Sequence, residues 1–487
     1  MGRTDVIDRQ EIMDFSREFG LAQNVIEKDY MLGWLLVGIS QHAELSASWA
    51  FKGGTCLKKC YFETYRFSED LDFTLTDAEH QDEGFLVNAF REIAGWIYDA
   101  SGIEVSRDLI RFEVYKNPRG KTSVQGRIAY RGPLRPGGDP PRIKLDLTDD
   151  EVLVADTVSR EVFHPYSDTP EGGIHVPCYC FEEVFAEKIR ALSERLRPRD
   201  LYDVIHLYRH DSTRQGRKLI LSILEAKCAF KGIPVPTMEI LKAKPEQAEL
   251  VLEWENMLGH QVPVLPPFEQ FWQELPEVFE WLYRAVEKAA PPAIPVGRQT
   301  IDSSWRVPVM ARAWHTKVPL EPVRFAAANH LCVQLNYIDA EGIRKTPIIE
   351  PYSLRQTSEG NLLLYAVKHE TGEPRAYRVD RIQSAEVTKI AFTPKYAIEL
   401  SAAGPLSAPS ITTRTVGIER IRPQRIKSTS RRRGSTTSNH GPKYIFECSY
   451  CGKKFTHKTN DPKLGKHKDK QGYPCSGRRG MYIDTKF

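Results

Sequence analysis

The chain has 487 residues, of which 41% are hydrophobic and 27% are charged, and its formal net charge is +4. This length predicts two to four domains, and the composition is typical of a globular protein. No apolar run approaches the roughly 20 residues of a membrane-spanning helix, and the polar N-terminus lacks the apolar core of a signal peptide. We therefore expect a cytoplasmic protein without a membrane partner.

The first part of the chain combines strand and helix patterns. "SWAFKGG" is typical of a strand that ends in glycines, and "DLDFTL" and "PRIKLDLT" are typical of further strands. "FEEVFAEKIRALSERL" has apolar residues at helical spacing, "RDLYDVIHLYRH" restarts a helix after Pro198, and "FEQFWQELPEVFEWLYRAV" continues the helical region. An α/β portion followed by helices is expected before residue 289.

The pattern changes after the Pro-rich segment Ala289–Thr300, which we interpret as a linker. From about Phe325 to Ile382, short alternating segments turn near Gly342 and Gly372, which predicts a small β-rich domain. The polar, basic segment Ser428–Lys443 has no periodicity, so we expect it to be disordered or to order only on binding.

The charge is distributed unevenly along the chain. From Ile411 to Phe487 there are 19 Lys+Arg and 5 Asp+Glu, which gives +14 and leaves −10 for the first 410 residues. A basic tail on a mildly acidic body favours a nucleic-acid partner held by the tail. A solvated, solubilising tail is the alternative.

Two aspartates dominate the polar stretch near residue 70. Asp70 and Asp72 flank Leu71, so on a strand their carboxylates share one face. Carboxylates so close repel unless a cation lies between them, and Mg²⁺ takes a few carboxylates while leaving positions for triphosphate oxygens. Asp146, on the same face of its strand as Lys144, offers a third carboxylate for phosphoryl or nucleotidyl transfer. An isolated Asp-x-Asp is otherwise a solvated strand edge.

Other residues of the chain suit phosphate. Gly53 and Gly54 end a strand, Thr55 is placed to cap a helix, and Lys58 lies one turn into it. Lys188 is of a type able to neutralise phosphate charge, although a lysine on an amphipathic helix is usually a surface residue. "RPRDLYDV" adds Arg199, Asp200 and Asp203, of which Asp200 could serve only as an N-cap.

Five of these segments follow one another along the chain: "FKGGTCLKK", "RFSEDLDF", "KLDL", "EKIRAL" and "RDLYDV". In this order they resemble the AbiEii family of nucleotidyltransferase toxins, which is found in type IV toxin–antitoxin systems and in phage defence. With "VIEKDYMLGWLL" and "LEWENMLGHQVPVLPPFEQFWQELPEVFEWL", the resemblance covers about residues 10–288. It implies an α+β fold with a polymerase-beta-like nucleotidyltransferase core and a helical C-terminal part. It also implies Mg²⁺-dependent transfer of a nucleoside monophosphate from an NTP, in toxin–antitoxin or abortive-infection biology.

The resemblance also implies residue roles and partners. Catalytic roles are expected for Asp70, Asp72, Asp146, Lys188 and Asp203. Of these, Asp70, Asp72 and Asp146 are expected to hold Mg²⁺. Nucleotide binding is expected of Gly53, Gly54, Thr55, Lys58, Arg66 and Ser68. RNA is the favoured acceptor, for example the 3′ end of tRNA, and a cognate antitoxin is an expected partner. A protein acceptor is one alternative; a nucleic-acid-binding sensor whose nucleotidyltransferase domain only binds nucleotide is another.

The β-rich segment has its own resemblance. "VQLNYIDAEGIRKTPIIEPYSLR" and "GEPRAYRVDRI" resemble a WYL domain, a small Sm-like β-barrel that senses ligands or nucleic acid in bacterial regulators. Leu362-Leu363-Leu364 replaces the name-giving triad. Three arginines match the family's arginine-bearing strand and could grip phosphate, or they are ordinary strand-face charge: Arg375, Arg378 and Arg381.

The tail contains a metal-ligand pattern. Cys448 and Cys451 form a Cys-x2-Cys turn, and Cys475 with His467 or His457 can complete a tetrahedral Zn²⁺ site. His467 is favoured because it lies in one hairpin-like unit with Cys475. Such a short module would depend on the structural Zn²⁺ for its fold, and reduced free thiols are the alternative.

These interpretations divide the chain into six parts. They are a nucleotidyltransferase core over 1–212, a helical extension over 213–288, a linker over 289–300, a WYL-like domain over 301–400, a basic flexible linker over 401–443 and a zinc-binding module over 444–487.

Overall fold

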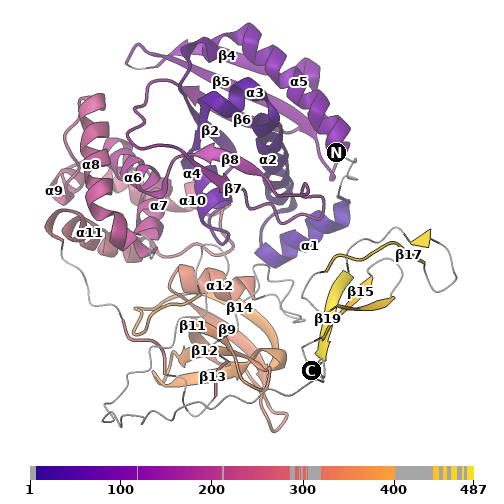
Figure 1. Cartoon of the computed structure of the whole chain (residues 1–487). Coiled ribbons are helices and arrows are strands. Elements are labelled where there is room, and N and C mark those ends of the chain that lie inside the picture. The colour runs from indigo at the N-terminus through magenta and orange to yellow at the C-terminus, as the bar shows by residue number, and fades with distance from the viewer. Residues whose placement is uncertain are drawn as a thin grey trace, which may run out of the picture. The chain divides into compact units, whose positions relative to one another are not determined.

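The computed structural model describes residues 7–117, 119–135, 137–210, 213–285, 291–295, 297, 300–302, 304, 320–400, 443–448, 453–457, 462–468, 474–475 and 480–486. The chain separates into two compact units, Met1–Thr412 and Thr413–Phe487. Figure 1 shows the elements of both units. Among the described helices, none is both long enough and apolar enough to span a membrane.

A mixed sheet forms the centre of the N-terminal domain. The described strands are β1 (Trp49–Lys52), β2 (Asp70–Leu75), β3 (Glu104–Val105), β4 (Arg111–Lys116), β5 (Thr122–Arg131), β6 (Arg142–Thr148), β7 (Val158–Glu161) and β8 (His175–Cys178). Their order is β3-β5-β6-β2-β1-β8-β7, with β4 paired to β5. β2 runs parallel to β6 and antiparallel to β1, so β2 is a central strand. The three strands predicted from sequence are confirmed.

Helices cover this sheet. They are α1 (Arg9–Phe19), α2 (Gln23–Gln41), α3 (Ala43–Ser48), α4 (Gly53–Cys56), the π-helix η1 (Leu57–Tyr61), the short 3-10 helices η2 (Ala78–Gln81) and η3 (Arg107–Leu109), and α5 (Glu83–Ser101). α2 is buried along most of its length, and its second half is the continuous apolar run Met31–Ile39. α5 packs against α2, β3 and β4.

The helical region follows the sheet. It consists of α6 (Phe181–Arg195), α7 (Pro198–Arg209), α8 (Thr213–Lys231), α9 (Met238–Lys242), α10 (Gln247–Leu258) and α11 (Phe268–Arg284). Pro198 opens α7 at the first helical position, where a missing N–H costs no hydrogen bond. α6 packs on α7 and α8, and α11 packs on α7 (Figure 1). The predicted helices are confirmed.

A second domain of the same unit begins with α12 (Glu321–Ala328) and continues as β9 (Leu331–Ile338), β10 (Arg344–Lys345), β11 (Ile348–Gln356), β12 (Leu362–Lys368), β13 (Pro374–Arg378), the 3-10 helix η5 (Val379–Arg381) and β14 (Ile382–Ala391). The strand order is β10-β9-β11-β12-β13, with β14 on β9. The predicted turns are confirmed, with φ of 79° at Gly342 and 70° at Gly372. The predicted start of the strands at Phe325 is wrong, because the chain remains helical to Ala328.

The C-terminal unit has a much smaller core. Its described strands are β15 (Lys443–Cys448), β16 (Lys454–His457), β17 (His467–Lys468), β18 (Pro474–Cys475) and β19 (Gly480–Lys486). Phe446, Cys448, Leu464 and Cys475 form the buried cluster among the described residues. Two of these four side chains are cysteines, so apolar packing alone gives this unit little stability. The predicted linker over 401–443 lies outside the described residues except for Lys443.

Candidate active site

Strand register brings the predicted carboxylates together. Asp72 on β2 is the direct partner of Asp146 on β6, and Asp70 is the partner of Lys144. On its other side, Asp72 is paired with Lys52 of β1. Because paired residues of neighbouring strands project from the same face, the carboxylates of β2 and β6 form one acidic cluster.

The electrostatics of this cluster favour a cation. Burial, and then the neighbouring Asp146 charge, raise the pKa of Asp72 to about 6. Burial also raises the pKa of Asp70, although Lys144 and Lys28 oppose this. The Lys144 Nζ lies 2.6 Å from Asp146 Oδ2, which offsets one charge. Carboxylates that resist ionisation for these reasons fit a Mg²⁺ site, since a divalent ion supplies the missing positive charge.

Gly53 allows the backbone to approach this cluster. Its φ of 81° is in the left-handed region. A Cβ atom placed at Gly53 would lie 2.1 Å from Oδ2 of Asp72, so no side chain fits there. A Cβ at Gly54 would lie 2.7 Å from Nη2 of Arg66 and 3.0 Å from Oγ of Ser68. The glycines therefore place the peptide backbone directly beside Asp72, as close approach of phosphate to backbone requires.

Two predicted nucleotide contacts have other partners in the structure. Thr55 was expected at a helix N-cap, but α4 begins at Gly53 and the N-cap is Lys52. The Thr55 hydroxyl instead donates to the carbonyl of Asp70, which ties α4 to β2. Lys58 is 2% exposed. Its ammonium donates to the Glu63 carbonyl and lies 4.6 Å from the Phe67 ring centroid, so its described contacts are within the core.

Asp203 belongs to a buried ion network instead of the carboxylate cluster. Arg66 binds it with two hydrogen bonds, of 2.7 and 2.8 Å. The Lys188 Nζ lies 2.8 Å from Asp203 Oδ2, and the Tyr65 hydroxyl donates to Oδ1 at 2.5 Å. Burial opposes ionisation of Asp203, but Arg66 and Lys188 outweigh it and hold the pKa well below its ordinary value. Asp203 thus holds the Arg66 and Lys188 side chains in place.

Sequence reasoning missed Lys52 and Glu187. Lys52 is 7% exposed, and its ammonium lies 3.7 Å from Oε1 of Glu187 on α6. Both Lys52 and Lys188 lower the pKa of Asp72, so the cluster faces two lysines. Lys52 directly precedes Gly53 in the "FKGG" motif, which was the available signal. Its pairing with Asp72 depends on strand register that the sequence does not display.

The three arginines of the second domain do not lie on one strand face. Arg375 and Arg378 are on β13 but three residues apart, so they point to opposite faces. Arg381 was expected on the same strand, but it lies in η5, where the chain has already turned. Arg375 Nη2 is 2.9 Å from Glu373, and Arg378 Nη2 is 2.6 Å from Asp380. This arrangement favours the alternative of ordinary strand-face charge.

The tail gathers three of its four predicted zinc ligands. Ligand atoms of Cys448, His467 and Cys475 lie within 4.8 Å of one another, and the two sulfurs are 3.7 Å apart. Cys451 lies outside the described residues. Nδ1 of His467 lies 2.9 Å from the Gly465 carbonyl oxygen, and this hydrogen bond orients the imidazole ring. The donor set suits Zn²⁺.

Comparison with known proteins decides the family. The family model described as "Nucleotidyl transferase AbiEii toxin, Type IV TA system" matches residues 34–283, just over half of the chain. The chain belongs to the AbiEii family of nucleotidyltransferase toxins. It is therefore a nucleotidyltransferase, and the matched span is narrower than the expected 10–288. Residues 319–387 match the family model of the WYL domain, so the AbiEii domain is followed by a WYL domain.

Two solved structures are similar to parts of this AbiEii-family chain. MenT4, a nucleotidyltransferase toxin from Mycobacterium tuberculosis H37Rv, is 18% identical to this chain in sequence. The two structures superpose with a TM-score of 0.41, and the alignment covers 58% of this chain and 91% of MenT4. The proteasome accessory factor B/C of Arthrobacter aurescens is 12% identical with a TM-score of 0.15, covering 77% and 74% respectively. No curated protein matches the chain. The assignment thus rests on the family models.

Proposed function

We propose that the chain transfers a nucleoside monophosphate from a Mg²⁺-bound NTP to RNA, with Asp70, Asp72 and Asp146 as the ligands of Mg²⁺. The observation that carries this proposal is the direct pairing of Asp72 with Asp146 across β2 and β6, next to Gly53. When bound, Mg²⁺ would neutralise triphosphate charge and orient the α-phosphate. The family membership is consistent with this chemistry but leaves the acceptor open.

The chain's own residues would divide the remaining work. Gly53 and Gly54 let the triphosphate lie against backbone N–H groups, while Ser68 lies beside Gly54. Lys52 and Lys188 supply fixed positive charge close to Asp72, where charge develops during transfer. Asp203 and Arg66 act as positioning residues, because they hold Lys188 and the segment before β2 in place. Thr55 serves the same purpose through the Asp70 carbonyl.

RNA is the proposed acceptor because of the tail. Its charge of +14 over residues 411–487 would bind phosphates by releasing counterions, so affinity should fall steeply with salt. We also propose a structural Zn²⁺ at Cys448, Cys451, His467 and Cys475, which would hold part of that charge on a rigid surface. The WYL domain would act as a regulatory module, and a cognate antitoxin would restrain the enzyme in the cytoplasm.

The test is label transfer by purified full-length protein. The protein is incubated with Mg²⁺, each α-labelled NTP in turn, and total RNA or total protein. We expect label in RNA, and loss of at least about 10³-fold in rate for Asp72→Ala, because one charged group of the transition-state site is removed. Asp99→Asn on the exposed side of α5 is the control and should retain the wild-type rate.

Other outcomes would separate the alternatives. Label in protein would replace RNA as the acceptor while keeping the carboxylate site. Nucleotide binding without transfer, together with unchanged behaviour of Asp72→Ala, would favour the sensor function. Wild-type transfer by Asp72→Ala would exclude Asp72 as a catalytic residue.

A further inference from the structure

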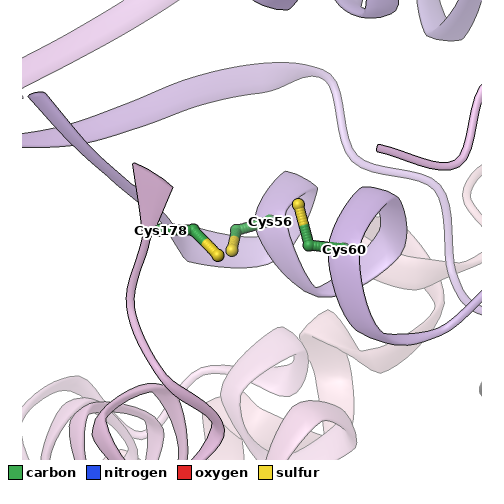
Figure 2. A group of neighbouring side chains, drawn as sticks. All are labelled: Cys56, Cys60 and Cys178. Atoms are coloured by element: carbon green, nitrogen blue, oxygen red, sulfur yellow. The ribbon is translucent and has the colours of Figure 1, made fainter. Parts of the chain in front are cut away.

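Three cysteines from different elements meet in the nucleotidyltransferase domain. Cys56 ends α4, Cys60 lies in η1, and Cys178 ends β8, more than 100 residues away. Their sulfur atoms all lie within 4.8 Å of one another, and Figure 2 shows the three cysteines, with the Cys56 and Cys178 sulfurs side by side. Cys56 and Cys178 are 0% exposed and Cys60 is 6% exposed. None of these residues belongs to the carboxylate cluster.

The three thiols are buried together, and one arginine lies beside them. The Cys56 and Cys60 thiols can donate hydrogen bonds to the Cys178 sulfur. Arg160 adds positive charge nearby, since its Nε donates to the Cys60 carbonyl at 3.0 Å and its guanidinium lies 4.5 Å from the Tyr61 ring centroid. A lone buried cysteine is usually an apolar packing residue, but three that share hydrogen bonds form a donor set.

We propose that Cys56, Cys60 and Cys178 form a second metal site, which binds one thiophilic d¹⁰ metal ion, Cu⁺ or Zn²⁺, through three thiolates. Three sulfurs bound to one ion at about 2.3 Å lie about 4 Å apart, so the present spacing needs only a small contraction. Thiolates are soft ligands, which select Cu⁺ and Zn²⁺ over Mg²⁺. The site therefore does not compete with the carboxylate cluster for its ion.

Metal binding at these cysteines would act on the segment Gly53–Cys56, which contains the proposed nucleotide-binding glycines. Cys56 directly follows Thr55, whose hydroxyl is bonded to the Asp70 carbonyl, and Gly53 begins the same short helix. A metal ion that joins α4, η1 and β8 would hold this segment at a fixed distance from the sheet. The site would be built during folding, because its ligands are buried and come from segments that are distant in sequence.

The test uses the full-length chain carrying Cys448→Ser and Cys475→Ser, which removes two of the four proposed tail ligands. The protein is purified without oxygen, loaded separately with Cu⁺ and Zn²⁺, and exchanged into metal-free buffer before metal per chain is measured. We expect about one equivalent of at least one ion, with a sulfur-to-metal charge-transfer band for Cu⁺. Adding Cys178→Ser should remove that equivalent or weaken its affinity at least about 10-fold.

Cys228→Ser is the matched control, because Cys228 is a buried cysteine of α8 outside the cluster. It should retain the full metal equivalent. If Cys178→Ser does not fold, Cys60→Ser is measured in its place, and alkylation of the three thiols in the parent chain is compared with and without metal. Equal metal content in the cluster variants and Cys228→Ser, or alkylation that metal does not slow, would overturn the proposal.

Discussion

The carboxylate cluster of the AbiEii domain and the ligand cluster of the tail are both proposed metal sites, but they are built in opposite ways. Asp70, Asp72 and Asp146 project from a sheet whose core contains many buried side chains. Cys448 and Cys475 are themselves half of the described buried cluster of their unit. If both proposals hold, the catalytic ion joins a fold that is already complete, whereas the structural ion completes the fold of its unit.

The largest effect on folding is expected when the tail loses one of its proposed zinc ligands. Cys448→Ser should release about one zinc per chain and unfold the C-terminal unit, because Zn²⁺ contributes on the order of 10 kcal/mol to such modules. The AbiEii and WYL domains should keep their thermal transition. Metal analysis combined with limited proteolysis checks this prediction. A tail that resists proteolysis as well as the wild type would show that the ion is dispensable.

Within the AbiEii domain, the strongest effect on stability should come from the buried ion network. Asp203→Asn leaves Arg66 and Lys188 without their shared carboxylate, which should cost about 3–5 kcal/mol of unfolding free energy. Denaturant unfolding measures the loss. Asp99→Asn, at an exposed position, should change it by less than about 0.5 kcal/mol. Similar values for the two variants would contradict the structural role of Asp203.

Gly53→Ala should damage activity more than stability. The added Cβ would collide with the Asp72 carboxylate, and φ of 81° is strained for alanine, so the carboxylate should move and transfer should fall about 10²-fold. Gly120→Ala is a matched control, since Gly120 has φ of 75° but no atom within 4 Å of the point that a Cβ would occupy. Steady-state transfer and thermal unfolding are measured for both. Equal losses of activity would mean that strain alone, without displacement of Asp72, explains the effect.

The smallest effect is a pH dependence of stabilisation by Mg²⁺. Burial and Asp146 raise the pKa of Asp72 to about 6, so in the metal-free fold its ionisation lowers stability as the pH rises from about 4 through 6. Mg²⁺ needs the ionised form and should therefore raise the melting temperature more at pH 8 than at pH 5. Asp72→Asn should flatten this difference. The tail, without carboxylates in its ligand set, should show no such response to Mg²⁺.

The sequence predicted the parts of the site that depend on local periodicity. Asp70 and Asp72 share a face because the side-chain period of a strand is two, and Asp146 lies on a neighbouring strand as expected. The burial of Lys58 was not predictable, because helical spacing does not reveal that its ammonium lies against the Phe67 ring. The pairing of Arg66 with Asp203 spans 137 residues, which no local pattern can indicate.

Outside the candidate site, too, local features were predictable from the sequence and long-range contacts were not. The turns at Gly342 and Gly372 were predictable because positive φ favours glycine. The placement of Arg381 in η5 was not, since the sequence "RAYRVDRI" continues a strand-like alternation through the turn. The three-cysteine cluster likewise joins β8 to α4 and η1, and Cys178 is more than 100 residues from the other two cysteines, so no local pattern indicates it.

Binding of Mn²⁺ in the presence of a non-hydrolysable NTP analogue shows whether the carboxylates of β2 and β6 form one metal site. Mn²⁺ affinity is measured by electron paramagnetic resonance for the full-length wild type, Asp72→Asn, Asp146→Asn and the double variant. We predict a loss of at least about 10-fold for each single variant, and a double variant whose loss is smaller than the two combined, since both carboxylates serve the same ion. Wild-type affinity in either single variant, or strictly additive losses, would contradict the account.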